Sequence, residues 1–167
     1  NIVPIRYRPF DIRFTYYTGR SRGFHCMPRY EIMKSMLKQN IGLYTCRQIS
    51  GENWQHILIT DKITDDCYVS NKTKERGYLF PLFSYLDDGT RLYNLNEKMI
   101  KELNKLYSRE IPQEDIFFYI YGLLQSKKYR KRYEEFLKRD FPRIPFPNDY
   151  FNFIEISLVG ICDLRRS

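Results

Sequence analysis

The chain has 167 residues, of which 43% are hydrophobic and 17% aromatic, enough to bury the core of one domain or two small lobes. Its formal charge of +8 favours an anionic partner without indicating a fold. The sequence has no signal peptide and no apolar run of membrane-spanning length, so we expect a cytoplasmic protein without a membrane partner. Four widely spaced cysteines lack any Cys-x-x-Cys pair, which excludes the usual zinc templates and favours reduced thiols.

The N-terminal half is expected to be rich in β-strands. Residues 4–30 are dense in turn residues and arginine, which indicates loops and short strands. Residues 28–37 are expected to form a helix, because Pro28 suits a first helical turn and apolar side chains follow at helical spacing. Short apolar runs separated by polar turns then predict an antiparallel meander, with strands at residues 43–49, 56–60, 67–69 and 78–85.

The C-terminal half is expected to be helical, since the apolar period changes after the turn at residues 87–89. Asn96 and Ser126 are suitable N-caps for two of the helices. The expected helices cover residues 95–106, 112–124, 127–139 and 151–164. The sequence therefore predicts an α+β fold, with a strand-rich antiparallel N-terminal half followed by a helical C-terminal half. We expect one domain over residues 1–167, made of a strand-rich lobe (1–90) and a helical lobe (91–167).

The first thirty residues are the most informative part of the chain. They contain six arginines interleaved with aromatic residues, and Asp11 is the only acid, so this stretch carries 6 − 1 = +5. Arginine grips phosphate or a guanine edge with a planar fork, and aromatic rings offer stacking faces. This pattern predicts a nucleic-acid surface, whose candidate contacts are Arg6, Arg8, Arg13, Arg20 and Arg22.

A structural role for the same residues is the alternative. Arg13 could pair with Asp11, and the nearby aromatic residues Tyr7, Phe10, Phe14 and Tyr16 could belong to the core. We expect both interpretations to hold in part. Alternate aromatic residues would pack, while Arg20 and Arg22, beside glycines, would lie on an exposed loop.

A second candidate is the polar, basic segment at residues 70–77. Amides, small hydroxyls and long cations are the groups that read base edges and hold phosphates. The DNA-binding candidates in it are Asn71, Lys72, Thr73, Lys74 and Arg76, with a solvated hairpin loop as the alternative. The helix at residues 127–139 is also basic, but acids at i,i+4 spacing favour a solvated helix over a DNA-binding one.

Three segments together resemble a known family: residues 7–30, residues 69–82 and the stretch from Pro112 to Pro145. In this order they are similar to the region that follows the methyltransferase domain in Type ISP and Type IIG-like restriction-modification enzymes. The resemblance implies that the chain is the sequence-specific duplex-DNA recognition module of a larger bacterial enzyme. In that family an adjacent domain methylates the N6 of adenine, and another domain cuts DNA. S-adenosylmethionine and magnesium would then serve the parent, and the methyltransferase domain would be a partner within the same chain. A first residue other than Met agrees with a fragment.

No catalytic constellation emerges from the sequence. The glycine-rich cofactor loop and the Asn/Asp-Pro-Pro-Tyr/Phe site of the related methyltransferases do not occur, and no two prolines are adjacent. The acid pairs at residues 65–66 and 87–88 are typical of turns. We therefore expect no catalysis, no cofactor and no metal in this chain itself. An RNA- or DNA-binding accessory domain outside restriction-modification and a cryptic nuclease are the alternatives.

Overall fold

The computed structural model describes residues 1–22, 24–51, 53–72 and 75–164. Strands come first along the chain: β1 (Ile2–Arg8), β2 (Asp11–Tyr16), β3 (Gly42–Cys46), β4 (Ile57–Thr60), β5 (Ile63–Thr64), β6 (Gly77–Pro81), β7 (Phe83–Tyr85) and β8 (Arg91–Tyr93). One helix interrupts them and five follow: α1 (Tyr30–Met36), α2 (Glu97–Tyr107), α3 (Gln113–Gln125), α4 (Lys127–Arg132), α5 (Glu134–Leu137) and α6 (Tyr150–Leu164). The predicted α+β class, with helices dominating the second half, is confirmed.

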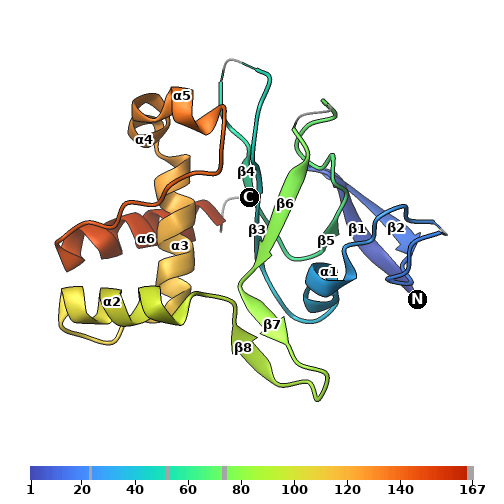
Figure 1. Cartoon of the computed structure of the whole chain (residues 1–167), viewed down its shortest axis with the longest axis horizontal. Helices are drawn as coiled ribbons and strands as arrows, with labels where there is room; N and C mark the ends of the chain where they lie inside the picture. The colour runs from blue at the N-terminus through green and yellow to red at the C-terminus, as the bar shows by residue number, and fades with distance from the viewer. Residues whose placement is uncertain (23, 52, 73–74, 165–167) are drawn as a thin grey trace.

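The centre of the fold is a three-stranded antiparallel sheet in the order β4-β3-β6. All five residues of β3 are buried, so both faces of this strand are covered. Leu43 joins the hydrophobic cluster built with α2, α3 and α6, whereas Tyr44, on the opposite face, joins the cluster built with β1 and α1. Figure 1 shows this arrangement, with β3, β4 and β6 between the helices α2–α6 on one side and β1, β2, β5 and α1 on the other.

The outer sheet has the order β2-β1-β5 and corrects one expectation. β1 and β2 form an antiparallel hairpin, but β5 pairs with β1 in parallel. The sequence predicted no strand at β5, whose partner is the first strand of the chain. The predicted meander is wrong in its order, because β6 pairs with β3 and not with the strand that precedes it. The parallel pairing continues in a hydrogen bond of 3.1 Å from Asp65 N to the carbonyl of Arg6. A pairing across almost sixty residues leaves no local pattern for the sequence to reveal.

Other predicted boundaries also change. Residues 67–69 form no strand, because Asp65 and its neighbours make a turn in which the amide of Tyr68 donates to the carbonyl of Asp65. The strand expected at 78–85 is divided between β6 and β7 at Leu82, whose amide donates to Ile41 instead. The helix expected at 127–139 is divided into α4 and α5 at Tyr133, which leaves helical geometry with φ −110°.

The helical side is held by close packing and by tyrosine hydroxyls. Asn96 and Ser126 cap α2 and α4 as predicted, with side-chain oxygens that accept from the amides of residues 99 and 129. Three buried tyrosines fix the proline-rich segment before α6 by donating to its carbonyls: Tyr107 to Pro147, Tyr119 to Pro145 and Tyr129 to Arg143. Among the described residues, no helix is long and apolar enough to cross a membrane.

Candidate nucleic-acid interface

The two arginines of β1 are each held by an acid. A guanidinium nitrogen of Arg6 lies 3.5 Å from Asp61, and one of Arg8 lies 3.2 Å from Asp65. Arg8 also lies over the ring of Tyr7, with 4.1 Å to the ring centroid. Arg6 is the more enclosed of the two, since its Nε is buried and has no hydrogen-bond partner within the described part of the chain. Arg8 is therefore the better placed of the two to reach a phosphate.

Arg13 pairs with Asp11 at 2.8 Å, as the structural alternative anticipated. The guanidinium also covers the ring of Tyr7 at 3.9 Å. The other half of that alternative is wrong. Phe10 and Phe14 are 99% and 75% exposed and Tyr16 is 50% exposed, so these three aromatic residues lie on the surface of the hairpin. None of the six residues of β2 is buried, so nothing within the described chain covers the outer face of this strand.

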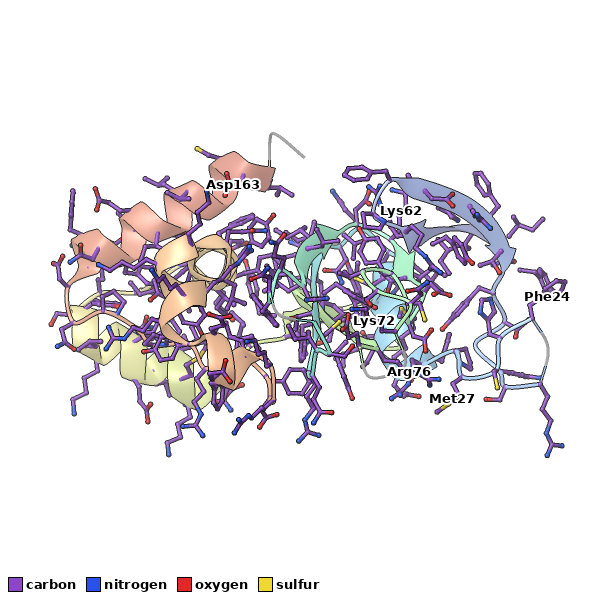
Figure 2. All side chains as sticks on the ribbon, turned by 90° about the horizontal axis from the view of Figure 1, so that it is seen from above. Phe24, Met27, Lys62, Lys72, Arg76 and Asp163 are labelled. Atoms are coloured by element: carbon purple, nitrogen blue, oxygen red, sulfur yellow. The ribbon has the colours of Figure 1, made fainter. Side chains whose placement is uncertain are left out.

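Arg20 and Arg22 lie exposed on the segment between β2 and α1. Gly19 and Arg22 have φ angles of 71° and 68°, so the chain turns sharply there. The base of the segment is fixed, because the hydroxyl of Tyr17 donates to the carbonyl of Pro28. Figure 2 shows Phe24 and Met27, from the same segment, on the side of the molecule away from α2 and α6. This segment is thus a separate cationic projection.

The second candidate segment connects β5 to β6. Asn71, Lys72 and Arg76 are exposed, while Thr73 and Lys74 lie outside the described residues. Arg76 Nε lies 3.6 Å from Asp66, and Lys72 Nζ lies 3.9 Å from Glu75. The pair between Arg76 and Asp66 joins two exposed groups and is therefore worth little, so Arg76 can exchange its acid for a phosphate at small cost. Figure 2 shows Lys72 and Arg76 in the middle of the molecule.

Glu75 anchors this segment to the core. Its side chain is 3% exposed and accepts from the amide and hydroxyl of Ser50 at 2.7 and 2.6 Å. The other carboxylate oxygen lies 3.1 Å from His56 Nε2. Burial opposes ionisation, but hydrogen bonds from Ser50 and Ser70 and the nearby His56 lower the pKa of Glu75 to about 2. Burial lowers the pKa of His56, partly opposed by Glu75.

The fold brings some candidate cations together and leaves others apart. Arg8 and Arg76 pair with the adjacent acids Asp65 and Asp66, so the end of β1 meets the segment before β6. A hydrogen bond of 2.9 Å from the amide of Gly77 to the carbonyl of Asp66 fixes that meeting. Arg13, by contrast, pairs within β2.

A cluster of neighbouring side chains in this region could hold a metal ion, judged by distance alone. Ligand atoms of Asp65, Asp66 and Cys67 lie within 4.8 Å of one another. Asp65 is already bonded to Arg8 and to the amide of Cys67, and Asp66 pairs with Arg76. A thiol is also a poor ligand for magnesium, which prefers oxygen. The donor set therefore does not fit magnesium, and we assign no metal site here.

The basic helix behaves as a structural element. Arg130 donates to the carbonyl of Leu124 and lies over the ring of Trp54, with 5.7 Å to the ring centroid. Lys138 pairs with Glu134 and Glu135 at 3.1 and 2.9 Å. These contacts support the solvated-helix interpretation for this part of the chain.

Sequence reasoning missed an aromatic surface beside the second candidate segment. Tyr78 and Phe80 of β6 are 40% and 46% exposed, although the sequence placed them in an ordinary apolar strand. They alternate with buried Leu79 and Pro81 in the structure, but this run of the sequence is apolar throughout and shows no alternation. Which of the two alternating faces is exposed depends on how the helices cover the sheet.

Comparison with known proteins agrees with this architecture. A family described as the Type ISP C-terminal specificity domain matches residues 1–161, which confirms the resemblance noted from three sequence segments. A DrdV–DNA complex determined by electron cryomicroscopy superposes with a TM-score of 0.78 and 29% identity over 96% of this chain and 15% of that one. A nuclease-deletion mutant of the Type ISP restriction-modification enzyme LlaGI, with a DNA substrate mimic, gives 0.67 and 26% over 94% of this chain and 11% of that one. No curated protein sequence matches the chain.

Proposed function

Because this chain belongs to the family of Type ISP C-terminal specificity domains, we propose that its exposed cationic segments bind duplex DNA and select its sequence. The observation that carries the proposal is the segment at residues 70–76. It presents Asn71, Lys72 and Arg76 to solvent, while the buried carboxylate of Glu75 fixes its base. A segment with a fixed attachment to the fold limits how its side chains can approach the edge of a nucleobase. This limit is the requirement for discrimination between DNA sequences.

We assign different tasks to the two exposed segments. Arg20 and Arg22 project from a segment remote from the others and would hold phosphates, which carry no base identity. Arg8 and Arg76 converge around Asp65 and Asp66, and Lys72 lies beside Glu75 in the same segment as Arg76, so that a groove edge could be read there. In this proposal the acids orient the cations and release them to the DNA.

The parent enzyme carries the chemistry. The relatives with solved structures are far longer, and this chain spans 15% or less of each. We propose that the parent is an S-adenosylmethionine-dependent, adenine-specific DNA methyltransferase with a magnesium-dependent nuclease in the bacterial cytoplasm. Its methyltransferase domain would be the intramolecular partner of this chain and would flip the target adenine. The chain itself would be catalytically silent.

A binding experiment tests the proposal. Duplexes preferred by the chain are first selected from a randomised library, and dissociation constants are then measured by fluorescence anisotropy on preferred and scrambled duplexes. We expect Arg20→Ala to weaken both alike. We expect Asn71→Ala or Arg76→Ala to cost roughly 1–3 kcal/mol on the preferred duplex and little on the scrambled one.

A salt titration provides the control for this experiment. Each phosphate contact adds about 0.9 to the slope of log affinity against log salt on B-DNA, so the slope must be steep in the wild type and shallower in Arg20→Ala. Absence of any duplex preference, or a flat titration, would contradict the proposal. Methyl transfer or cleavage by the chain alone would contradict its catalytic silence.

A further inference from the structure

The edge strand β6 presents an exposed stripe of large side chains. Arg76, Tyr78 and Phe80 follow one another at alternate positions and are exposed, whereas Leu79 between them and Pro81 after them are buried. Tyr78 and Phe80 pair with Thr45 and Leu43 of β3 and therefore lie on the face of the sheet that the helices cover. The exposed residues Arg76, Tyr78 and Phe80 therefore form the uncovered margin of that face.

Phe141, from the segment after α5, completes the aromatic surface. Its ring meets those of Tyr78 and Phe80 edge to face, with centroids 4.9 and 5.9 Å away. We call these three residues the aromatic strip. A shared partner ring holds Tyr78 and Phe80 in fixed orientations, so the strip presents a preformed shape.

Cations border the strip. The guanidinium of Arg47 lies 5.9 Å from the centroid of the Phe141 ring and is held by Asp140 at 2.9 Å. The amide of Phe141 and the guanidinium of Arg47 lower the pKa of Asp140, and exposed Arg143 adds to this effect. Arg76 begins the stripe from the candidate DNA-binding segment. The aromatic strip, flanked by Arg47, Arg76 and Arg143, is complementary to a nucleic acid, which is anionic and carries apolar groups on its base edges.

A hollow adjoins the strip. A cavity of about 360 Å³ lies between the sheet and α3, and Phe80 and Phe141 form part of its wall. Thr45 also lines it, and its hydroxyl is buried without a partner among the described residues. The strip is therefore the rim of a mostly apolar recess. Exposed aromatic residues on an edge strand promote aggregation in a protein that leaves them uncovered.

We infer that Tyr78, Phe80 and Phe141 form a base-contacting surface that packs against base edges in a groove of bound duplex DNA. The inference rests on the proposed function and names the apolar part of the same recognition site. Arg76 would provide hydrogen bonds at one end of the strip, and the aromatic side chains would contact apolar groups such as the thymine methyl. Arg47 and Arg143 would hold the flanking phosphates.

The test compares Tyr78→Ala and Phe80→Ala with Phe151→Ala, a control that removes a 64% exposed aromatic residue from α6. Dissociation constants are measured on the preferred and scrambled duplexes. We expect each strip variant to lose roughly tenfold or more affinity for the preferred duplex and little for the scrambled one, since a base contact is absent from the latter. The Phe151→Ala variant should bind both as the wild type does. Phe80→Leu keeps apolar volume at the strip and should retain more discrimination than Phe80→Ala.

Thermal melting establishes that each variant is folded before binding is compared. Replacement of single thymines by deoxyuridine in the preferred duplex should weaken the wild type at one position and leave Phe80→Ala or Tyr78→Ala unaffected there. Undiminished discrimination in both folded strip variants would overturn the inference and leave the strip to another covering, such as the rest of the parent chain. Equal losses on both duplexes would overturn it too. If the wild type binds no duplex selectively, the proposed function itself fails.

Discussion

Glu75 shows how a single buried carboxylate can serve a surface loop. The residue lies between exposed Arg76 and the segment that contains Asn71, yet its own side chain points into the fold and accepts two hydrogen bonds from Ser50. The thiol of Cys46 also contacts the carbonyl of Glu75 at 2.9 Å. The charge of Glu75 thus fixes the position of the residue, because a carboxylate that accepts several hydrogen bonds is stable only where its donors lie.

The first prediction concerns the pH dependence of stability. The folded-state pKa of Glu75 is about 2 against an ordinary value of 4.5. Because the folded pKa is depressed, the stabilisation is fully present above pH 4.5 and is lost as the pH falls toward 2. The difference corresponds to on the order of 3 kcal/mol. We expect Glu75→Gln to lower the free energy of urea unfolding at pH 6 and to lower it much less at pH 3.

The exposed acid Glu110 offers the matched control, since Glu110→Gln should leave the unfolding free energy nearly unchanged at either pH. A destabilisation by Glu75→Gln that is equal at pH 6 and pH 3 would show that the carboxylate charge is not what holds the segment.

Single residues also show how far the sequence could be interpreted. The pair between Arg13 and Asp11 follows from spacing in a strand and was anticipated. The role of Asn40 was not, because its amide bridges the carbonyls of Ser35 and Phe83 and its oxygen accepts from Phe83 N. Two of these bonds join residues more than forty positions apart. A local pattern predicts that such an asparagine ends a helix, but it cannot identify the strand that the side chain ties down.

Secondary-structure elements were predictable where their signals are local. The helices α2 and α4 begin where Asn96 and Ser126 cap them, and α3 carries its acids in the first turn. The division of the expected 78–85 strand depends on Ile41, which draws the amide of Leu82 out of register. The exposure of β2 was unpredictable for a related reason, since burial of a strand face depends on what else covers it.

The second prediction concerns the contact between α3 and α6. The helices approach backbone to backbone, so that a methyl group on Gly160 would lie 2.2 Å from the carbonyl oxygen of Phe118 and 3.1 Å from the amide of Gly122. Backbone cannot give way as a flexible side chain can. We expect Gly160→Ala to lower the free energy of unfolding by about 2 kcal/mol or more, although alanine is the better helix former.

Val159 lies next to Gly160 on the same helix and is 51% exposed, so Val159→Ala provides a control for helix propensity without a clash. Urea denaturation followed by circular dichroism compares the two variants. Equal stability of Gly160→Ala and Val159→Ala would mean that the helices are not in backbone contact.

At the scale of the whole molecule, the central sheet joins two hydrophobic clusters. Cluster one contains Leu43 and Phe153, and cluster two contains Tyr44 and Leu79, so adjacent residues of β3 serve opposite cores. The division into lobes at residues 1–90 and 91–167 stays a prediction. However, β3 and Trp54, from the first half of the sequence, belong to the cluster of the helices. A strand shared in this way should couple the two halves when the protein unfolds.

The third prediction is therefore a single cooperative unfolding transition. The one tryptophan, Trp54, is 3% exposed in the helical cluster and reports on it by fluorescence. Leu79→Ala opens a cavity in the other cluster and should cost roughly 2–5 kcal/mol, and Phe153→Ala within the helical cluster should cost roughly 3–5 kcal/mol. If β3 transmits the loss, both variants lower the urea midpoint measured by Trp54 fluorescence, and far-ultraviolet circular dichroism gives the same midpoint in each.

A Trp54 transition that stays at the wild-type midpoint in Leu79→Ala, while circular dichroism shows an earlier loss, would mean that the two clusters unfold independently. The base of the segment at residues 70–76 would then stay anchored while the other cluster unfolds, since Glu75 is held by Ser50 in the loop that carries Trp54.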